Sequence, residues 1–162
     1  MDSKRTHKEL RKLLDNVLDD IKDHPTVLKM FDEYNVDIEE IHLIPLCFDD
    51  NLDVSARTDH AIIYLRSSLI DTPEEIAHYL VHEITHYLQQ TTGDKPTKGA
   101  DYGNYLDNDE EIEGFKNQTE YMSDTKGDDE AEKYIEQVLD YHDVDNGERK
   151  KRKKELLQLA SL

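Results

Sequence analysis

The apolar residues of this chain recur with the spacing of helix faces along most of its length. In residues 3–22, leucine, valine and isoleucine return every three or four positions, so this segment is expected to be an amphipathic helix. Pro25 interrupts the pattern and begins a second, shorter one. Further helical patterns cover residues 109–125, the segment after Gly127 and residues 146–159. The chain is therefore predicted to be mostly helical.

Two apolar stretches lack helical spacing and are predicted to be β-strands, residues 41–48 and residues 59–66. Pro45 has no N–H to donate to a neighbouring strand, so the first strand is expected at an edge or a bend. We expect the two strands to pair in a small antiparallel sheet of two or three strands. Residues 59–66 are the candidate free edge, where an extended peptide would bind by strand addition. His42 and His60 lie in these strands and are interpreted as structural.

The segment after the second strand carries the clearest helix signals in the chain. Thr72-Pro73-Glu74-Glu75 is typical of a helix start, and Gly93 is typical of a helix end. One face of this helix is apolar and consists of Ile76, Ala77, Leu80, Val81, Ile84, Tyr87 and Leu88. The opposite face carries polar and metal-binding residue types, namely Glu75, His78, Tyr79, His82, Glu83, His86, Gln89 and Gln90.

The polar face contains the sequence His82-Glu83-Ile84-Thr85-His86, an H-E-x-x-H motif. Histidines four residues apart lie one helical turn apart on the same face, so both imidazoles can reach one zinc ion. Glu83 projects about 100° around the helix from His82, which places it beside the metal without making it a ligand. His78 lies one turn earlier. It is interpreted as solvated, and the alternative is a group on the substrate side or one that supports a ligand.

A catalytic zinc site usually has three protein ligands, so a third ligand is expected elsewhere. Cys47 is a poor candidate because it lies in an apolar strand. On the predicted helix 109–125, Glu111 shares the inward face with Phe115, Gln118 and Met122, whereas Glu113 falls on the solvent face. A buried carboxylate needs a partner, and zinc would provide one. The alternative is that Glu111 closes a capping box with Asn108.

The motif, followed on a later helix by Glu111-x-Glu113-Gly114-Phe115, resembles the zincin metallopeptidases of the gluzincin type. It also resembles small intracellular or phage-encoded zincins that cleave repressors. The resemblance covers roughly residues 56–125. It implies a Zn²⁺ ion held by His82, His86 and Glu111, with Glu83 as general base. The implied fold is a minimal, mostly helical α+β zincin whose small sheet packs against the motif helix.

Two positions depart from the pattern of that family. Gly114 stands where alanine is common, which we interpret as a minor change. Phe115 stands where an aspartate or asparagine commonly supports a ligand. Support for His82 or His86 is therefore expected from elsewhere in the chain.

The length of 162 residues is typical of one domain. We predict a single zincin-like domain over 1–162, with amino-terminal helices in 1–40, the sheet in 41–66, the metal-site helices in 72–125 and carboxy-terminal helices in 128–162. Residues 93–107 are rich in Gly, Pro, Asn and Asp and are predicted to be a loop. Its Tyr102 and Tyr105 are candidates for stabilising an oxyanion, and the alternative is that they are ordinary packing residues.

The amino-acid composition disfavours some classes of binding partner. The chain has 20 Lys and Arg against 38 Asp and Glu, a formal net charge of −18, which disfavours nucleic acid and anionic membranes. The basic run at residues 149–154 is either a nucleic-acid or localisation patch or, as we favour, an exposed face attracted to the acidic remainder of the chain. The single cysteine excludes an intrachain disulfide, and the first 20 residues lack an apolar signal region. A cytoplasmic location is therefore predicted.

These observations predict a zinc-dependent peptidase that hydrolyses a peptide bond in a peptide or protein substrate. The main alternative is a non-catalytic zincin-like binding or regulatory protein whose metal is structural or absent. A third interpretation centres on the basic run and makes the protein a nucleic-acid-associated factor. The sequence does not identify the substrate.

Overall fold

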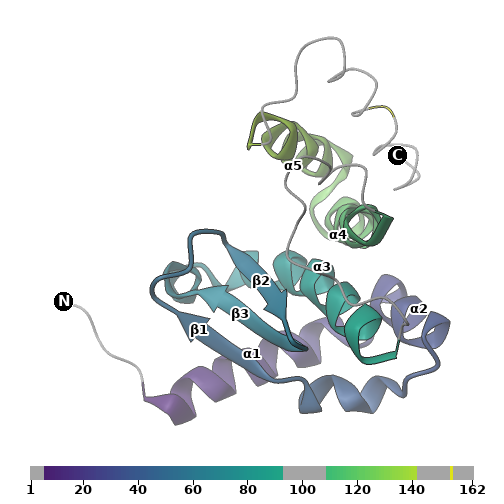
Figure 1. Ribbon diagram of the computed structural model, residues 1–162. Coiled ribbons are helices and arrows are strands. Elements are labelled where there is room, and N and C mark those ends of the chain that lie inside the picture. Colours follow the sequence, from purple (N-terminus) through teal and green to yellow (C-terminus); the bar gives the residue numbers. More distant parts are fainter. Residues whose placement is uncertain (1–5, 93–108, 142–153, 155–162) are drawn as a thin grey trace.

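Helices and one small sheet make up the part of the chain that the computed structural model describes, which is residues 6–92, 109–141 and 154 (Figure 1). In chain order the elements are α1 (His7–Ile21), α2 (Pro25–Glu33), the 3₁₀ helix η1 (Ile38–Leu43), β1 (Leu46–Asp49), β2 (Ala56–Asp59), β3 (Ile62–Arg66), the 3₁₀ helix η2 (Ser67–Asp71), α3 (Pro73–Thr92), α4 (Asp109–Lys126) and α5 (Asp128–Tyr141). The predicted α+β, mostly helical fold is confirmed.

The first residues of α1 and α2 are set by local capping interactions. Thr6 closes a capping box with Glu9, because its hydroxyl accepts from the Glu9 N–H at 3.2 Å and its own N–H donates to Glu9 Oε1 at 3.0 Å. Pro25 starts α2 as predicted, and the ring of His24 caps this helix by accepting from the N–H of Thr26.

The predicted strand 41–48 is shorter than expected. Its first half belongs to η1, and the strand begins at Leu46, directly after Pro45. Pro45 contributes only its carbonyl oxygen, which accepts from the N–H of Ile63 at 2.9 Å. Its missing N–H therefore costs no ladder hydrogen bond, and β1 lies at an edge of the sheet as expected.

The predicted strand 59–66 is in fact interrupted by a turn. Asp59 ends β2 and pairs with Ile62 of β3, and the two residues between them, His60 and Ala61, have left-handed φ values of 51° and 60°. This is the backbone of a tight hairpin turn, but it contains none of the Asn or Gly residues that usually mark one. For that reason the sequence did not indicate the hairpin.

The sheet is mixed rather than antiparallel. Its order is β1–β3–β2, with β2 antiparallel and β1 parallel to β3. The chain runs out along β1, returns along β2 and turns back along β3, so β1 and β3 point the same way. The central strand is β3, and the prediction that residues 59–66 form a free edge is wrong. The edge strand nearest to α3 is β2.

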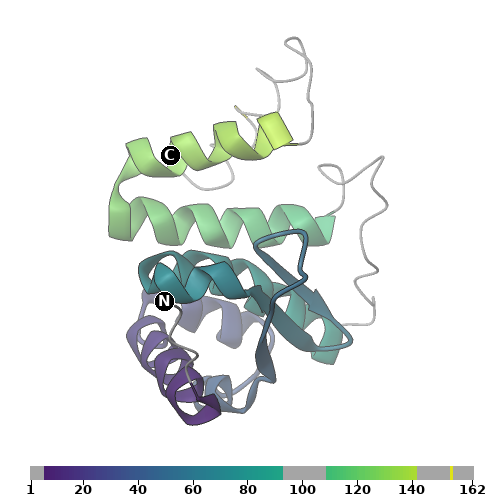
Figure 2. The same ribbon diagram turned by 90° about the vertical axis from the view of Figure 1, so that its left-hand side faces the viewer.

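The helix α3 lies at the centre of the fold. It contacts α1, α2, β2 and β3 on one side and α4 on the other, and α5 packs on the far side of α4, so that three helices are stacked in Figure 2. The main apolar core lies beneath α3 and draws on α1, α2, η1, β3 and α3 itself. A smaller apolar cluster joins α4 to α5 through Phe115, Ile135, Val138 and Leu139. Gly127, with φ of 96°, forms the tight connection between these two helices.

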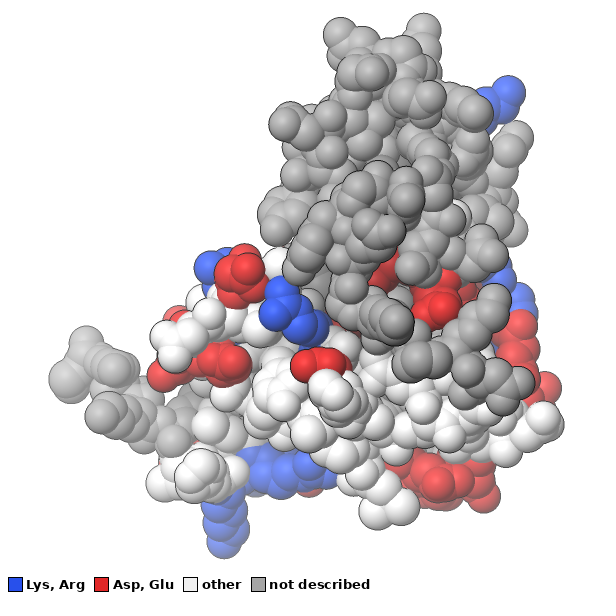
Figure 3. Space-filling view, in the orientation of Figure 1, with Lys and Arg blue, Asp and Glu red and all other residues white. Residues whose placement is uncertain are grey.

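Charged side chains are spread over the surface. On the face shown in Figure 3, acidic patches are separated by uncharged residues and by a few basic side chains. Within the described residues, no helix is long and apolar enough to cross a membrane. Several predictions lie outside the described residues: the loop 93–107 with Tyr102 and Tyr105, the helix end at Gly93, and the helix 146–159 with its basic run, apart from Lys154.

Candidate metal centre

The three predicted ligands come together between α3 and α4. His82 and His86 lie one turn apart on the face of α3 that α4 covers, and Glu111 extends from the first turn of α4. Their ligand atoms all lie within 4.8 Å of one another. The three side chains are buried, with exposed fractions of 5 %, 4 % and 7 % respectively. The helical projection of Glu111 onto the inward face is thus confirmed.

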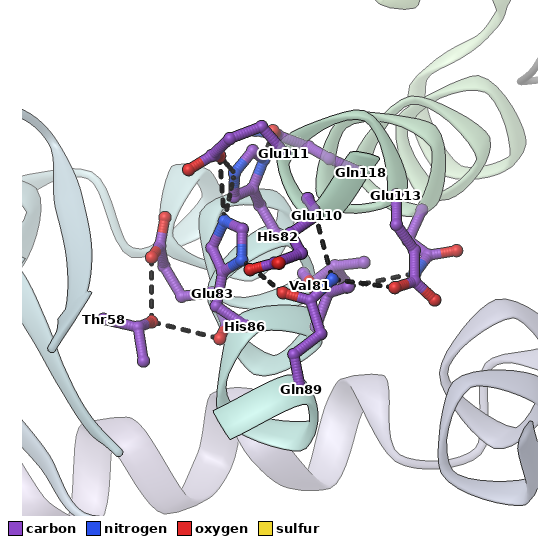
Figure 4. Close-up of polar contacts among 12 residues, drawn as sticks. Thr58, Val81, His82, Glu83, His86, Gln89, Glu110, Glu111, Glu113 and Gln118 are labelled. Atoms are coloured by element: carbon purple, nitrogen blue, oxygen red, sulfur yellow. Dashed lines mark hydrogen bonds and ion pairs between the residues drawn. The ribbon is translucent and has the colours of Figure 1, made fainter. Parts of the chain in front are cut away.

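The three ligand atoms form a compact triangle (Figure 4). Glu111 Oε1 lies 2.9 Å from His86 Nε2 and 3.1 Å from His82 Nε2, and the two Nε2 atoms are 3.1 Å apart. A tetrahedral zinc ion with bonds of about 2.0–2.1 Å would hold its ligand atoms roughly 3.3 Å apart. The triangle is therefore within a few tenths of an ångström of the size of one face of such a site.

Two glutamines orient the two histidines. His82 Nδ1 lies 3.0 Å from Gln118 Oε1, and His86 Nδ1 lies 2.8 Å from Gln89 Oε1. A carbonyl oxygen only accepts hydrogen bonds, so each Nδ1 carries a proton, and the neutral form of each ring has its Nε2 lone pair toward the centre of the triangle. That is the tautomer in which an imidazole binds a metal through Nε2.

The glutamine amides are themselves oriented by other groups. Gln89 Nε2 lies 2.7 Å from Glu113 Oε1 and 3.2 Å from the main-chain oxygen of Glu110, both of which are acceptors. Gln118 Nε2 lies 2.7 Å from Nδ1 of His78. In each amide the NH₂ group is therefore engaged on the side away from the triangle, and the oxygen must face the histidine.

Charge and proton binding agree with a cation site. Burial would raise the pKa of the Glu111 carboxyl group, but the hydrogen bonds and charges of His82 and His86 hold it well below its usual range. Burial by itself would lower the pKa of His86, yet the hydrogen bond and charge of Glu111 outweigh it and raise that pKa to about 9. The centre therefore attracts positive charge, and a proton and a metal ion compete for His86 Nε2.

Glu83 lies beside the triangle, on the side of the sheet (Figure 4). Its side chain is 7 % exposed. The hydroxyl of Thr58, on β2, lies 2.8 Å from Glu83 Oε1 and 3.1 Å from the main-chain oxygen of Glu83. Sequence reasoning missed Thr58, because the hairpin that carries it to α3 had no recognisable turn signal.

The prediction that Glu113 faces solvent is wrong. Its Oε1 accepts from Tyr34 Oη at 2.6 Å as well as from Gln89. Burial, together with the hydrogen bond and charge of Glu113, raises the pKa of Tyr34, so its hydroxyl stays protonated and donates. The reason is that α4 is covered by α2, α3 and α5 together, which leaves little of its surface to water.

Gly114 is more than a minor departure from the family pattern. A Cβ atom at this position would lie 3.0 Å from His82 Nε2 and 3.1 Å from two ring carbons of the same histidine. Glycine therefore allows α4 to approach the ring closely. The following residue, Phe115, packs edge-on against His82 with ring centroids 4.7 Å apart. Gln118, rather than the residue at position 115, supplies the polar support for His82.

The remaining candidate residues lie in different environments. His78 was expected in solvent but is 2 % exposed, and it lies against Glu75 and Gln118. His42 lies on η1 beside Asp19, and the His60 side chain is 89 % exposed in the hairpin turn. Cys47 lies partly exposed on β1, where burial raises the pKa of its thiol. The last three are not part of the centre.

Comparison of this chain with protein-family models, with curated proteins and with solved structures finds no match. The likeness to zincins therefore rests on the motif and on the α4 residues. The geometry supports the coarser statement directly: the buried group of His82, His86 and Glu111 can bind a metal ion.

Proposed function

We propose that the protein is a zinc-dependent peptidase whose metal is held by His82, His86 and Glu111. The observation that carries the proposal is the convergence of three acceptor atoms, two of which belong to histidine rings that separate hydrogen bonds orient. Two imidazoles and a carboxylate are a ligand set that zinc prefers, and a set of three is typical of catalytic rather than structural zinc. When bound, zinc supplies a Lewis acid that polarises a carbonyl group and makes water more acidic.

Glu83 is the general base of this proposal. It is next to His82 in the chain but does not join the triangle, so its carboxylate is not needed to hold the metal. Thr58 binds Oε1, and Oε2 is therefore the atom that we expect to accept a proton from water and to deliver it to the leaving amine. The hydroxyl of Thr58 also holds the carboxylate on the sheet side of the centre.

The sheet offers a place for the substrate. Thr58 and Ile63 are opposite each other in the hairpin, one position from the pair that closes the turn, so the N–H and C=O of Thr58 point away from β3. The outer edge of β2 therefore runs past Glu83, and at this edge the C=O of Thr58 accepts from Gln90 Nε2 at 3.4 Å. An extended peptide that adds to this edge would lie beside the metal centre, which favours a peptide substrate.

The burial of the centre favours one second candidate. His82, Glu83, His86 and Glu111 are each at most 7 % exposed, which is also compatible with a metal that only stabilises the packing of α3 on α4. In that case the protein would be a non-catalytic binding or regulatory protein. A structural zinc site needs a fourth side chain, and within the described residues the cluster contains three.

The proposal is tested with metal analysis and with cleavage of a proteome-derived peptide library read by mass spectrometry. We expect one zinc per wild-type chain. Glu83→Gln should retain zinc and lose at least about 100-fold in cleavage rate, because it removes general-base catalysis only. Glu111→Gln should lose zinc affinity and activity together. Glu74→Gln is the matched control, since Glu74 is exposed on the same helix and should behave as wild type.

The outcomes separate the two candidates. A wild-type protein that holds no zinc contradicts the metal centre itself. Full activity in Glu83→Gln would contradict the role of the base. Stoichiometric zinc without any cleavage, accompanied by a loss of stability when the metal is chelated, would establish the non-catalytic alternative instead.

A further inference from the structure

His78 is a buried histidine that the proposed reaction does not use. It lies one turn before His82 on the same face of α3, and α4 and α5 cover it. Its Nε2 lies 2.8 Å from Glu75 Oε2, and its Nδ1 lies 2.7 Å from Gln118 Nε2. Both ring nitrogens are therefore engaged, one at the rim of the protein and one in its interior.

The donor and the acceptor in each of these hydrogen bonds can be assigned. The Glu75 carboxylate only accepts, so His78 Nε2 carries a proton and His78 Nδ1 is an acceptor. That acceptor takes the NH₂ group of Gln118, and the amide oxygen is thereby turned toward His82 Nδ1. Lys126 Nζ lies 3.3 Å from the same oxygen of Glu75 and holds the outer end of the chain.

The direction matters because an amide has two nearly isosteric ends. If Gln118 were reversed, its NH₂ group would face His82 Nδ1, and the proton of His82 would have to move to Nε2. A protonated Nε2 cannot bind a metal. The reversed amide would also require a proton on His78 Nδ1. Burial lowers the pKa of His78 to about 4, against the opposing effect of Glu75, so the doubly protonated ring is disfavoured near neutral pH.

We propose that His78 is a positioning residue that fixes the orientation of the Gln118 amide and, through it, the tautomer with which His82 binds the metal. The inference rests on the proposed metal centre and adds a residue that touches neither metal nor substrate. His86 has no such histidine, because Gln89 is oriented by Glu113 and by the main-chain oxygen of Glu110. Only the His82 side of the centre should depend on His78.

The test combines zinc affinity, by competition with a chromophoric chelator, with two-bond ¹H–¹⁵N NMR of the histidine rings. The Gln118 amide also hydrogen-bonds Tyr134, but His78→Leu removes its ring acceptor and should weaken zinc binding about 10- to 100-fold, the usual range for partners of metal ligands. In zinc-free protein the His82 ring should then change from the Nδ1–H form to a mixture of tautomers. His86 should keep its wild-type ring signals.

Two further variants separate positioning from packing. His78→Asn places an amide oxygen near the position of Nδ1, so it should recover zinc affinity to within about threefold of wild type and restore the Nδ1–H form of His82. His42→Leu makes the same change as His78→Leu at a partly buried, carboxylate-bound histidine on η1, and should leave both readouts unchanged.

Wild-type zinc affinity and an unchanged His82 tautomer in folded His78→Leu would overturn the inference. So would a wild-type protein in which His78 carries its proton on Nδ1, a result that needs no variant and decides the matter even if His78→Leu fails to fold. If the wild type binds no zinc, the proposed function fails, while the ring tautomers of the zinc-free protein still test His78.

Discussion

Both faces of α3 contain buried residues, but one face packs in the apolar core and the other forms hydrogen bonds with α4. On one face Ile76, Leu80, Ile84 and Leu88 are fully buried in the apolar core. On the other face Thr85 is just as inaccessible, and its hydroxyl accepts from Asn117 Nδ2 of α4 at 3.0 Å and donates to the main-chain oxygen of Val81 at 2.9 Å. Burial alone therefore does not distinguish a core from a site. What distinguishes them is whether the buried atoms need hydrogen-bond partners.

The buried polar atoms on the polar face of α3 all have hydrogen-bond partners. Within the described residues, no buried side-chain nitrogen or oxygen lacks a hydrogen-bond partner. Leaving such a group unpaired costs free energy, so each polar residue constrains its neighbours. The apolar face has no directional constraint of this kind. We therefore expect substitutions on the apolar face to change stability, and those on the polar face to change stability and metal binding together.

The largest expected effect is on the apolar face. Leu80→Ala should lower the free energy of unfolding by about 2–5 kcal/mol, because it leaves a cavity in a packed core. Zinc affinity of the folded protein should stay within about threefold of wild type. Urea denaturation and chelator competition measure the two quantities. Leu28→Ala, at a residue that is 41 % exposed, should cost less than about 0.5 kcal/mol. A large loss of zinc affinity in Leu80→Ala would show that the two faces are coupled.

The second effect concerns His78 and pH. Its pKa is about 4 in the folded protein, below the usual value of 6.5, so the folded state binds fewer protons than the unfolded state between these values. The corresponding stability is present above about pH 6.5 and is lost as the pH falls through 4. It amounts to roughly 3 kcal/mol, from about 1.4 kcal/mol per pKa unit. Urea unfolding of zinc-free protein across this range measures it.

The control for this prediction is His78→Leu, in which the same pH range should cost correspondingly less stability. The charged and titratable groups around the ring are Glu75 and His82 on α3, Lys126 on α4, and Tyr79 and Tyr134, which contact it from α3 and α5. They remain in the variant, so the difference between the two pH profiles reports His78 together with the lowering of the Glu75 pKa that its hydrogen bond and charge cause. Identical profiles would contradict the prediction.

The smallest effect is expected at Gly114. Gly114→Ala places a Cβ atom against the His82 ring, and the ring or α4 must move by a few tenths of an ångström. We expect a loss of about 1 kcal/mol in stability and roughly tenfold in zinc affinity. Gly127→Ala is the matched control. Its φ of 96° makes alanine strained but nothing lies near the new atom, so it should reduce stability without changing zinc affinity.

Much of the centre could be predicted because it depends on local spacing. The helix signals placed the start of α3 at Pro73, and the helical projection placed Glu111 with Gln118 on the inward face of α4. The same projection failed for Glu113 and His78. Periodicity shows which residues share a face, but it does not show that α2 or α5 covers that face. The sheet failed for a similar reason, since strand order depends on a turn at His60 and Ala61 without a recognisable signal.

The sequence by itself determined the helical character of the chain, the one-turn spacing of His82 and His86 and the inward face of Glu111, because each depends on spacing within a single helix. The tertiary structure alone decided that Thr58 reaches Glu83, that Gln118 orients His82 and Glu113 orients Gln89, and that glycine at position 114 leaves room for the His82 ring. These are contacts between elements far apart in the chain. Their partners are chosen by how α3, α4 and β2 pack, and local spacing does not contain that information.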